Sequence, residues 1–195
     1  MSIRENPSQK LVEHIVGNKS TIHSHLDNKC EITHDSIYQV SVDYVKQNVT
    51  KCHSCIQECL EKENSKSELH LVVHFGVNSG AQQIHLESTA KNKIRDYVQY
   101  DGKIHDEGEE ELKCKLDLES VAKHLQGNNH KVSTSDDAGT YLCNYIYYQS
   151  ANAFSGCDNV IPIFIHIPDL SVCSIEDCHN CFVDFLKVLV EKYIA

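Results

Sequence analysis

The cysteine at position 143 follows a turn and precedes a helical pattern. The turn is Asp137-Ala138-Gly139, and apolar residues from Tyr141 to Ala151 repeat at helical spacing. This pattern predicts that Cys143 lies in or near the first turn of a helix, where free backbone N–H groups and the helix dipole stabilise a thiolate. The same N–H groups can bind the oxyanion that forms when a thiolate attacks a carbonyl carbon. Cys143 is therefore a candidate nucleophile.

A thiolate nucleophile needs a general base, and two residues could complete the site. His166 lies near the end of an apolar segment, Val160 to Ile167, and Glu87 follows another apolar strand by way of the Gly76 to Gly80 turn. In parallel α/β sheets, binding and catalytic sites lie outside the carboxyl ends of the strands, so His166 could meet Cys143 there. Glu87 would then orient the imidazole. A histidine on an apolar strand is also a common core residue, and an isolated glutamate is usually solvated, so the spacing alone leaves both interpretations open.

The elements that must position these residues alternate between helices and strands. Apolar periodicity predicts helices over residues 7–17, 43–60, 118–127, 141–151 and 175–193, and strands over residues 37–42, 70–77, 130–134 and 160–167. This order predicts an α/β fold, a three-layer α/β/α sandwich with a twisted, mostly parallel sheet, in one domain over residues 1–195. Residues 91–111 are polar and carry an acidic cluster, which predicts a long surface loop.

The composition narrows the classes of partner. The 195 residues include 28 Asp and Glu against 18 Lys and Arg, and the formal net charge of −10 would repel a phosphate backbone or an anionic membrane. No apolar run approaches the length of about 18 residues that a membrane span needs. Met1 to Lys10 has no apolar core of a signal peptide. We therefore expect a cytoplasmic protein with reduced thiols, and neither nucleic acid nor membrane as a partner.

The ten cysteines include two clusters that invite a metal interpretation. The clusters are Cys52, Cys55 and Cys59, and Cys173, Cys178 and Cys181. A zinc site needs four ligands that converge on one point. Cys52 and Cys59 share one apolar helical stripe, and Cys178 shares another with Phe182, which favours core cysteines that act as small apolar residues. One metal that joins the two clusters remains the alternative, and we predict no metal and no other cofactor.

Around the candidate nucleophile the sequence resembles the pyroglutamyl peptidase I family, cysteine peptidases that remove an N-terminal pyroglutamate from peptides. The segments that carry the resemblance occur in family order. They are Asn6-Pro7-Ser8, Tyr38 to Tyr44, Leu71 to Val77, Leu86-Glu87 with Asn92-Lys93, Ser135 to Asn144, and Phe164 to Pro168. The most specific stretch runs from Asp137 to Tyr148, with its paired tyrosines.

The resemblance implies a fold, an activity and site residues. The fold would be the phosphorylase/hydrolase-like α/β/α sandwich, and the family's catalytic Glu, Cys and His match Glu87, Cys143 and His166. Cys143 would attack the pyroglutamyl carbonyl, and a thioacyl enzyme would form and be hydrolysed. The resemblance further implies that the substrate, a peptide with an N-terminal pyroglutamate, is bound by three more residues. These are Asn6, Tyr141 and Leu142.

The sequence departs from the family ahead of Asn6. Family members begin with a strand and a Gly-Phe-Gly-Pro-Phe turn before the helix that starts at Asn-Pro-Ser, and nothing before Asn6 matches them. We therefore expect a chain that is N-terminally short by about one strand and one loop. This departure raises the alternative of a catalytically impaired homologue that acts as a binding or interaction protein. A zinc-stabilised module built on the two cysteine clusters is a third hypothesis.

Overall fold

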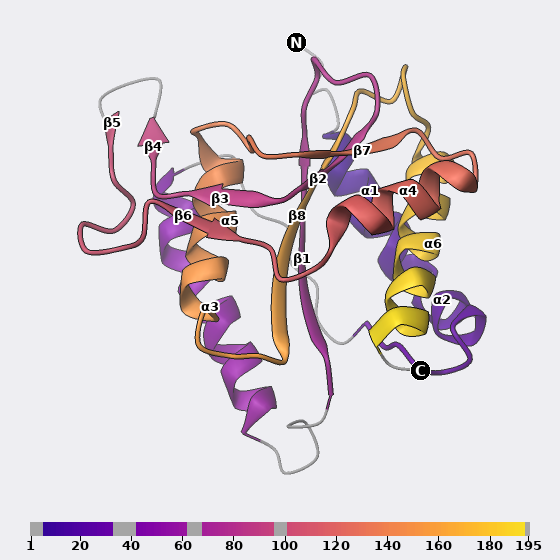
Figure 1. The fold of residues 1–195 in the computed structure, drawn as a ribbon, viewed down its shortest axis with the longest axis horizontal. Helices are drawn as coiled ribbons and strands as arrows, with labels where there is room; N and C mark the ends of the chain where they lie inside the picture. The colour runs from indigo at the N-terminus through magenta and orange to yellow at the C-terminus, as the bar shows by residue number, and fades with distance from the viewer. Residues whose placement is uncertain (1–5, 33–41, 62–67, 96–100, 194–195) are drawn as a thin grey trace.

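The computed structural model of the protein describes residues 6–32, 42–61, 68–95 and 101–193. Figure 1 shows how its elements are arranged. The helices are α1 (Pro7–Gly17), α2 (Lys19–His25), α3 (Val42–Leu60), α4 (Leu118–Gly127), α5 (Leu142–Ala153) and α6 (Ile175–Tyr193). The strands are β1 (His70–Val77), β2 (Ile84–Glu87), β3 (Thr89–Lys91), β4 (Ile94–Arg95), β5 (Asp101–Gly102), β6 (Glu111–Lys113), β7 (Val132–Ser135) and β8 (Val160–Ile167).

Four strands form the main sheet, in the order β1-β8-β2-β7. β1 is parallel to β8 and β2 is parallel to β7, whereas β2 and β8 are antiparallel. The sheet is therefore mixed and mostly parallel, as the sequence predicted. β8 lies between two neighbouring strands and all of its residues are buried, which explains why its sequence is a continuous apolar run.

Helices cover both faces of this sheet. α1, α4 and α6 pack together on one face, and α3 and α5 pack together on the other (Figure 1). Alternate residues of β8 point to opposite faces, as the two-residue period of a strand requires. Ile163 and Ile165 join the apolar core with α1 and α6, whereas Phe164 joins the core with α5. The three-layer sandwich predicted from the sequence is confirmed.

Side-chain caps begin the helices where the sequence placed them. Asn6 Oδ1 accepts a hydrogen bond from the backbone N–H of Ser8 and starts α1. At α6, Ser174 Oγ accepts from the backbone N–H of Asp177 and donates to the Asp177 carboxylate. These caps satisfy N–H groups that a helix leaves without backbone partners, so the helix starts are fixed locally. Among the helices that the structure describes, none is long and apolar enough to cross a membrane.

The segment from 91 to 111 is not the extended surface loop that its polarity predicted. β3 pairs with β6 where the segment begins and ends, and β4 pairs with β5 within it, so two short antiparallel ladders connect parts of the segment. Asn92 is buried, and its side chain accepts from the backbone N–H groups of Ile104 and His105 and donates to the carbonyls of His105 and Gly108. Polar hydrogen bonds rather than apolar contacts order this segment, which is why periodicity did not reveal it. Its acidic cluster remains exposed.

Other differences concern short strands. The strand predicted over residues 37–42 falls mainly outside the described residues. β7 covers 132–135 rather than 130–134. β2 was not predicted at all, because four residues, Ile84-His85-Leu86-Glu87, are too few to establish a period. Glu87 is therefore the last residue of a sheet strand and not part of a connection after β1.

Candidate active site

Cys143 is the second residue of α5 and lies against the backbone of β1. Gly139 has a φ of 80°, a left-handed conformation that suits glycine, and the turn leads to Tyr141 at the N-cap of α5. A Cβ atom added at Gly76 of β1 would lie 3.0 Å from Cys143 Sγ and 2.6 Å from Phe164 Cζ. The close approach of the thiol to the strand therefore requires a residue without a side chain at position 76.

His166 approaches the same place from β8. The strand register pairs His166 with Gly76 of β1 on one side and with His85 of β2 on the other. Cys143 is near enough to His166 to raise the pKa of the imidazole. His166 and Gly76 are each the last residue but one of their strands, so the thiol and the imidazole meet at the carboxyl ends of two parallel strands. This is where the sequence predicted that they would meet.

Glu87 binds the imidazole of His166 through its Nδ1 atom. Its Oε1 atom lies 2.7 Å from His166 Nδ1. Both side chains are buried, with Glu87 0% and His166 5% exposed. The Tyr147 hydroxyl donates to the backbone carbonyl of Glu87 over 2.9 Å, which ties the end of β2 to α5. The structure thus brings together the three residues that the sequence singled out, Glu87, Cys143 and His166.

The charge state of His166 follows from these contacts. Burial acts to lower the pKa of His166, but the interactions of the imidazole with Cys143 and Glu87 outweigh burial, and the pKa rises to about 9. The imidazole is therefore protonated at neutral pH. The second carboxylate oxygen of Glu87, Oε2, is buried and has no hydrogen-bond partner among the described residues, so the carboxylate is directed at the imidazole through Oε1.

Asn144, next to the candidate nucleophile, anchors α5 to the β3 segment. It is fully buried; its side chain accepts from the backbone N–H of Lys91 and donates to the carbonyls of Lys91 and Lys93. The Tyr148 hydroxyl donates to the carbonyl of Glu109. The sequence contained these residues in the motif after Cys143 but did not reveal their roles. Their hydrogen bonds join them to backbone groups that are far away in the sequence, and a local sequence pattern cannot predict such partners.

The predicted substrate-binding residues occupy two places. Tyr141 and Leu142 directly precede Cys143, and they belong to the apolar cluster that contains Phe164. Tyr141 is half-buried and Leu142 is buried. Asn6 caps α1, which lies on the other face of the sheet from α5, and its Oδ1 accepts from both the N–H and the hydroxyl of Ser8. Substrate contact by these three residues stays a prediction.

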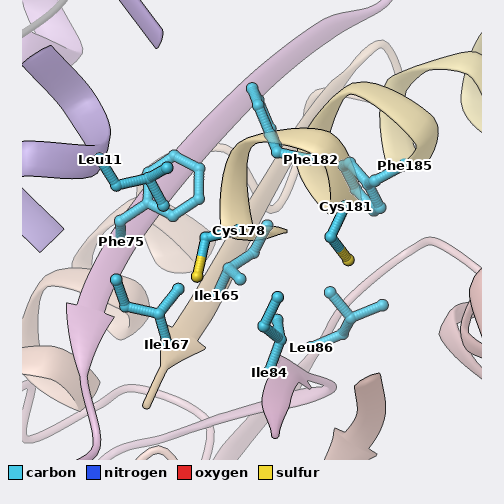
Figure 2. A pocket seen from close by; sticks show the side chains of 10 residues that line it. All are labelled: Leu11, Phe75, Ile84, Leu86, Ile165, Ile167, Cys178, Cys181, Phe182 and Phe185. Atoms are coloured by element: carbon cyan, nitrogen blue, oxygen red, sulfur yellow. The ribbon is translucent and has the colours of Figure 1, made fainter. Parts of the chain in front are cut away.

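The two cysteine clusters lie too far apart in the fold for one shared metal. Cys52 and Cys55 are on α3, and Cys178 and Cys181 are on α6, on opposite faces of the sheet (Figure 1). Cys178 and Cys181 are buried, and they line a small apolar cavity among aliphatic and phenylalanine side chains, including Ile165 of β8 (Figure 2). They are core residues, as predicted. On α3, Cys52 is half-buried and Cys55 is exposed.

The fold defines the class of protein. It is the fold of solved pyrrolidone carboxyl peptidases. The enzyme from the thermophilic keratin-degrading bacterium Fervidobacterium islandicum superposes with a TM-score of 0.73 and 21% identity, over 98% of this chain and 93% of that chain. The enzyme from Pyrococcus furiosus superposes with a TM-score of 0.75 and 17% identity, over 98% of this chain and 94% of that chain.

The sequence comparison gives the family. The model of the pyroglutamyl peptidase family matches residues 6–188, and the chain belongs to this family. Human pyroglutamyl-peptidase 1 is 29% identical over 144 residues, which are 69% of this chain and 62% of that protein. Human pyroglutamyl-peptidase 1-like protein is 33% identical over 107 residues, 52% of this chain and 53% of that protein. The matched region thus spans less than two thirds of the length of these curated relatives.

Proposed function

We propose that this protein is a cysteine exopeptidase that hydrolyses the bond after an N-terminal pyroglutamate in peptides. The observation that carries the proposal is the buried 2.7 Å contact between Glu87 and His166, with Cys143 near the same imidazole at the start of α5. Membership of the pyroglutamyl peptidase family supports the substrate class. The proposed location is the cytoplasm, a reducing compartment that keeps the thiol available.

In the proposed reaction, Cys143 attacks as a thiolate. His166 is protonated at neutral pH and places a positive charge beside the reacting sulfur. The thiolate attacks the pyroglutamyl carbonyl carbon, and the first-turn N–H groups of α5 receive the developing oxyanion. In the described structure no side-chain cap accepts hydrogen bonds from the first-turn N–H groups of α5.

The second half of the reaction uses the same imidazole. His166 gives its proton to the leaving amine, and the pyroglutamyl group stays bound to Cys143 as a thioester. His166, now neutral, takes a proton from a water molecule that attacks the thioester, and free pyroglutamate leaves. Glu87 keeps Nδ1 of His166 protonated throughout, so that Nε2 is the atom that exchanges the proton.

The proposed substrate pocket lies beside the nucleophile. Tyr141 and Leu142, the two residues directly before Cys143, would contact the pyroglutamyl ring. This ring is flat, uncharged and rich in carbon. Asn6 is proposed as a third substrate-binding residue, through the amide nitrogen that its capping bonds leave free for other contacts. Because the substrate has no free α-amine, no carboxylate is needed to recognise its N-terminus.

The direct test is release of a fluorophore from a pyroglutamyl amide. We expect turnover by the full chain, and a loss of about 10³-fold or more in Cys143→Ala, since removal of a nucleophile abolishes the covalent route. Cys55→Ala, a change at an exposed cysteine of α3, is the matched control and should keep full activity. Equal release by the full chain and Cys143→Ala would contradict the proposal. So would absence of release by a chain shown to be folded, and binding without turnover would support the impaired homologue.

A further inference from the structure

Two cysteines at the start of α6 are in contact. Cys178 Sγ lies 3.3 Å from Cys173 Sγ. Cys173 directly precedes the N-cap residue Ser174, and Cys178 lies in the second turn of the helix. These are the two positions at which apolar side chains commonly pack across a helix start. Because the bonds between Ser174 and Asp177 fix the first turn, the contact between the thiols is part of an ordered structure.

The two thiols face different surroundings. Cys173 lines a cavity of about 190 Å³, whose lining also includes Asn129, Lys131 and Asp177. These three residues are exposed, so the cavity opens toward solvent. Cys178 instead lines the interior apolar cavity of Figure 2. Of these two thiols, Cys173 is therefore the one that a small reagent meets from the open cavity.

The pKa values of Cys173 and Cys178 are shifted in opposite directions. The hydrogen bond that Cys178 donates lowers the pKa of Cys173, and the charge of Lys131 adds to this effect against burial and Asp177. The same hydrogen bond and burial raise the pKa of Cys178. Burial also raises the pKa of Cys181, the third cysteine of the cluster, to about 12. Cys173 is thus the more acidic thiol of the pair, and Cys178 is its hydrogen-bond donor.

We infer that Cys173 and Cys178 form a peroxide-reactive dithiol, separate from the candidate active site, that closes to a disulfide. The Cys173 thiolate attacks one oxygen of hydrogen peroxide, the O–O bond breaks, and the hydroxide that leaves takes up a proton as water. Cys173 is then a sulfenic acid. Cys178 loses its proton and attacks the Cys173 sulfur, the S–O bond breaks, and a second water forms. Two thiols are oxidised, and one peroxide is reduced to two waters.

The geometry of the pair suits this closure. The sulfur atoms must move from 3.3 Å to the bond length of about 2.05 Å. Cys173 precedes the helix and is not held by the helical backbone ladder, so it is the residue that can move. Cys181 lines both cavities but is one turn farther along α6, and no hydrogen bond links it to Cys173 among those of the described residues.

The test is peptide mapping of the full chain after treatment with hydrogen peroxide. Cleavage after Asp169 and Glu176 releases residues 170–176, in which Cys173 is the single cysteine, and cuts the chain between Cys173 and Cys178. We expect this peptide to stay linked to the one that carries Cys178 until a reductant is added. Before reduction, neither Cys173 nor Cys178 should react with an alkylating reagent. Since Cys143 lies in a different peptide, its own oxidation does not enter the result.

Variants separate the roles of the cysteines. Cys178→Ala should stop the chemistry at a Cys173 sulfenic acid, which dimedone traps, whereas Cys173→Ala should leave Cys178 unlabelled. Cys181→Ser, a change in the same cluster, should still form the linked peptides. Circular dichroism establishes that each variant is folded. Recovery of Cys173 as a free thiol, at a peroxide excess that oxidises a cysteine peptide added to the same tube, would overturn the inference. So would a disulfide that requires Cys181.

Discussion

Glu87 and His166 are diagonal neighbours on one face of an antiparallel pair of strands. Glu87 of β2 lies opposite Phe164 of β8, and His166 is two residues farther along β8 on the same face. The 2.7 Å contact between their side chains is therefore set by the register of the central sheet and not by a loop. A register shift of one residue would turn Glu87 to the other face, so the contact depends on the whole pairing of β2 with β8.

Removal of the Glu87 charge should change the pH range of activity. The bond to Glu87 and its charge raise the pKa of His166, so Glu87→Gln should lower that pKa below about 9. The proposed reaction needs protonated His166, so activity should be lost as pH rises through this pKa, and at lower pH in the variant. We expect kcat/KM to fall by about 10–10³-fold. The pH profile of fluorophore release measures both effects, and an unchanged alkaline limb would contradict the role of Glu87.

A methyl group at position 76 should damage the site directly. In Gly76→Ala the new Cβ would lie 2.6 Å from Phe164 Cζ and 3.0 Å from Cys143 Sγ, so one of these groups must move. We expect a stability loss of about 1–3 kcal/mol, typical of overpacking, and a larger fall in kcat than in substrate affinity. Gly80→Ala is the matched control, since its nearest neighbour, Asn78 Oδ1, is 3.5 Å away. Chemical denaturation and steady-state kinetics test the pair, and equal effects at both positions would refute the steric argument.

Asn144 should contribute strongly to stability. Its fully buried side chain makes three hydrogen bonds to the backbone of Lys91 and Lys93, and Asn144→Ala removes all three. We expect a loss of about 2–4 kcal/mol in the free energy of unfolding. Asn180→Ala, at an exposed position of α6, should change it by less than about 0.5 kcal/mol. Urea unfolding measures the difference, and a loss below about 1 kcal/mol for Asn144→Ala would contradict the anchoring role.

A histidine pair on the α5 face should make the protein sensitive to mild acid. The Ser150 hydroxyl bridges His53 and His74 at 2.9 Å and 2.8 Å, and burial, with the nearby His53, lowers the pKa of His74 to about 3. In the unfolded chain His74 takes up a proton near pH 6.5, whereas the folded protein keeps it neutral. Stability should therefore fall as pH drops below 6.5, by about 3 kcal/mol down to pH 4.

The variant that tests this sensitivity is His74→Gln, which cannot take up a proton. Its free energy of unfolding should depend less on pH between 6.5 and 4 than that of the unchanged protein, and the two curves should converge toward acid. His124→Gln, at an exposed position of α4, should leave the pH dependence as it is. Parallel curves for the unchanged protein and His74→Gln would assign the acid sensitivity to other groups.

Local features of this protein are present in its sequence. The apolar run from Val160 to Ile167 predicted β8, the capping residues Asn6 and Ser174 predicted the starts of two helices, and the turn before Cys143 predicted a thiol at a helix N-terminus. These predictions succeeded because each depends on residues that are close in the chain. Strand runs, caps and turns are determined by near neighbours, and their residue types carry the signal.

Contacts between distant segments were decided by the tertiary structure alone. The sequence did not contain the antiparallel pairing that places Glu87 beside His166, the close approach of Cys143 to Gly76, or the hydrogen bonds through which Asn92 orders residues 91–111. Nor did it distinguish Cys173, at an open cavity, from Cys178 in the core. Each depends on strand register and on which face a side chain occupies, and a single residue of register reverses that face.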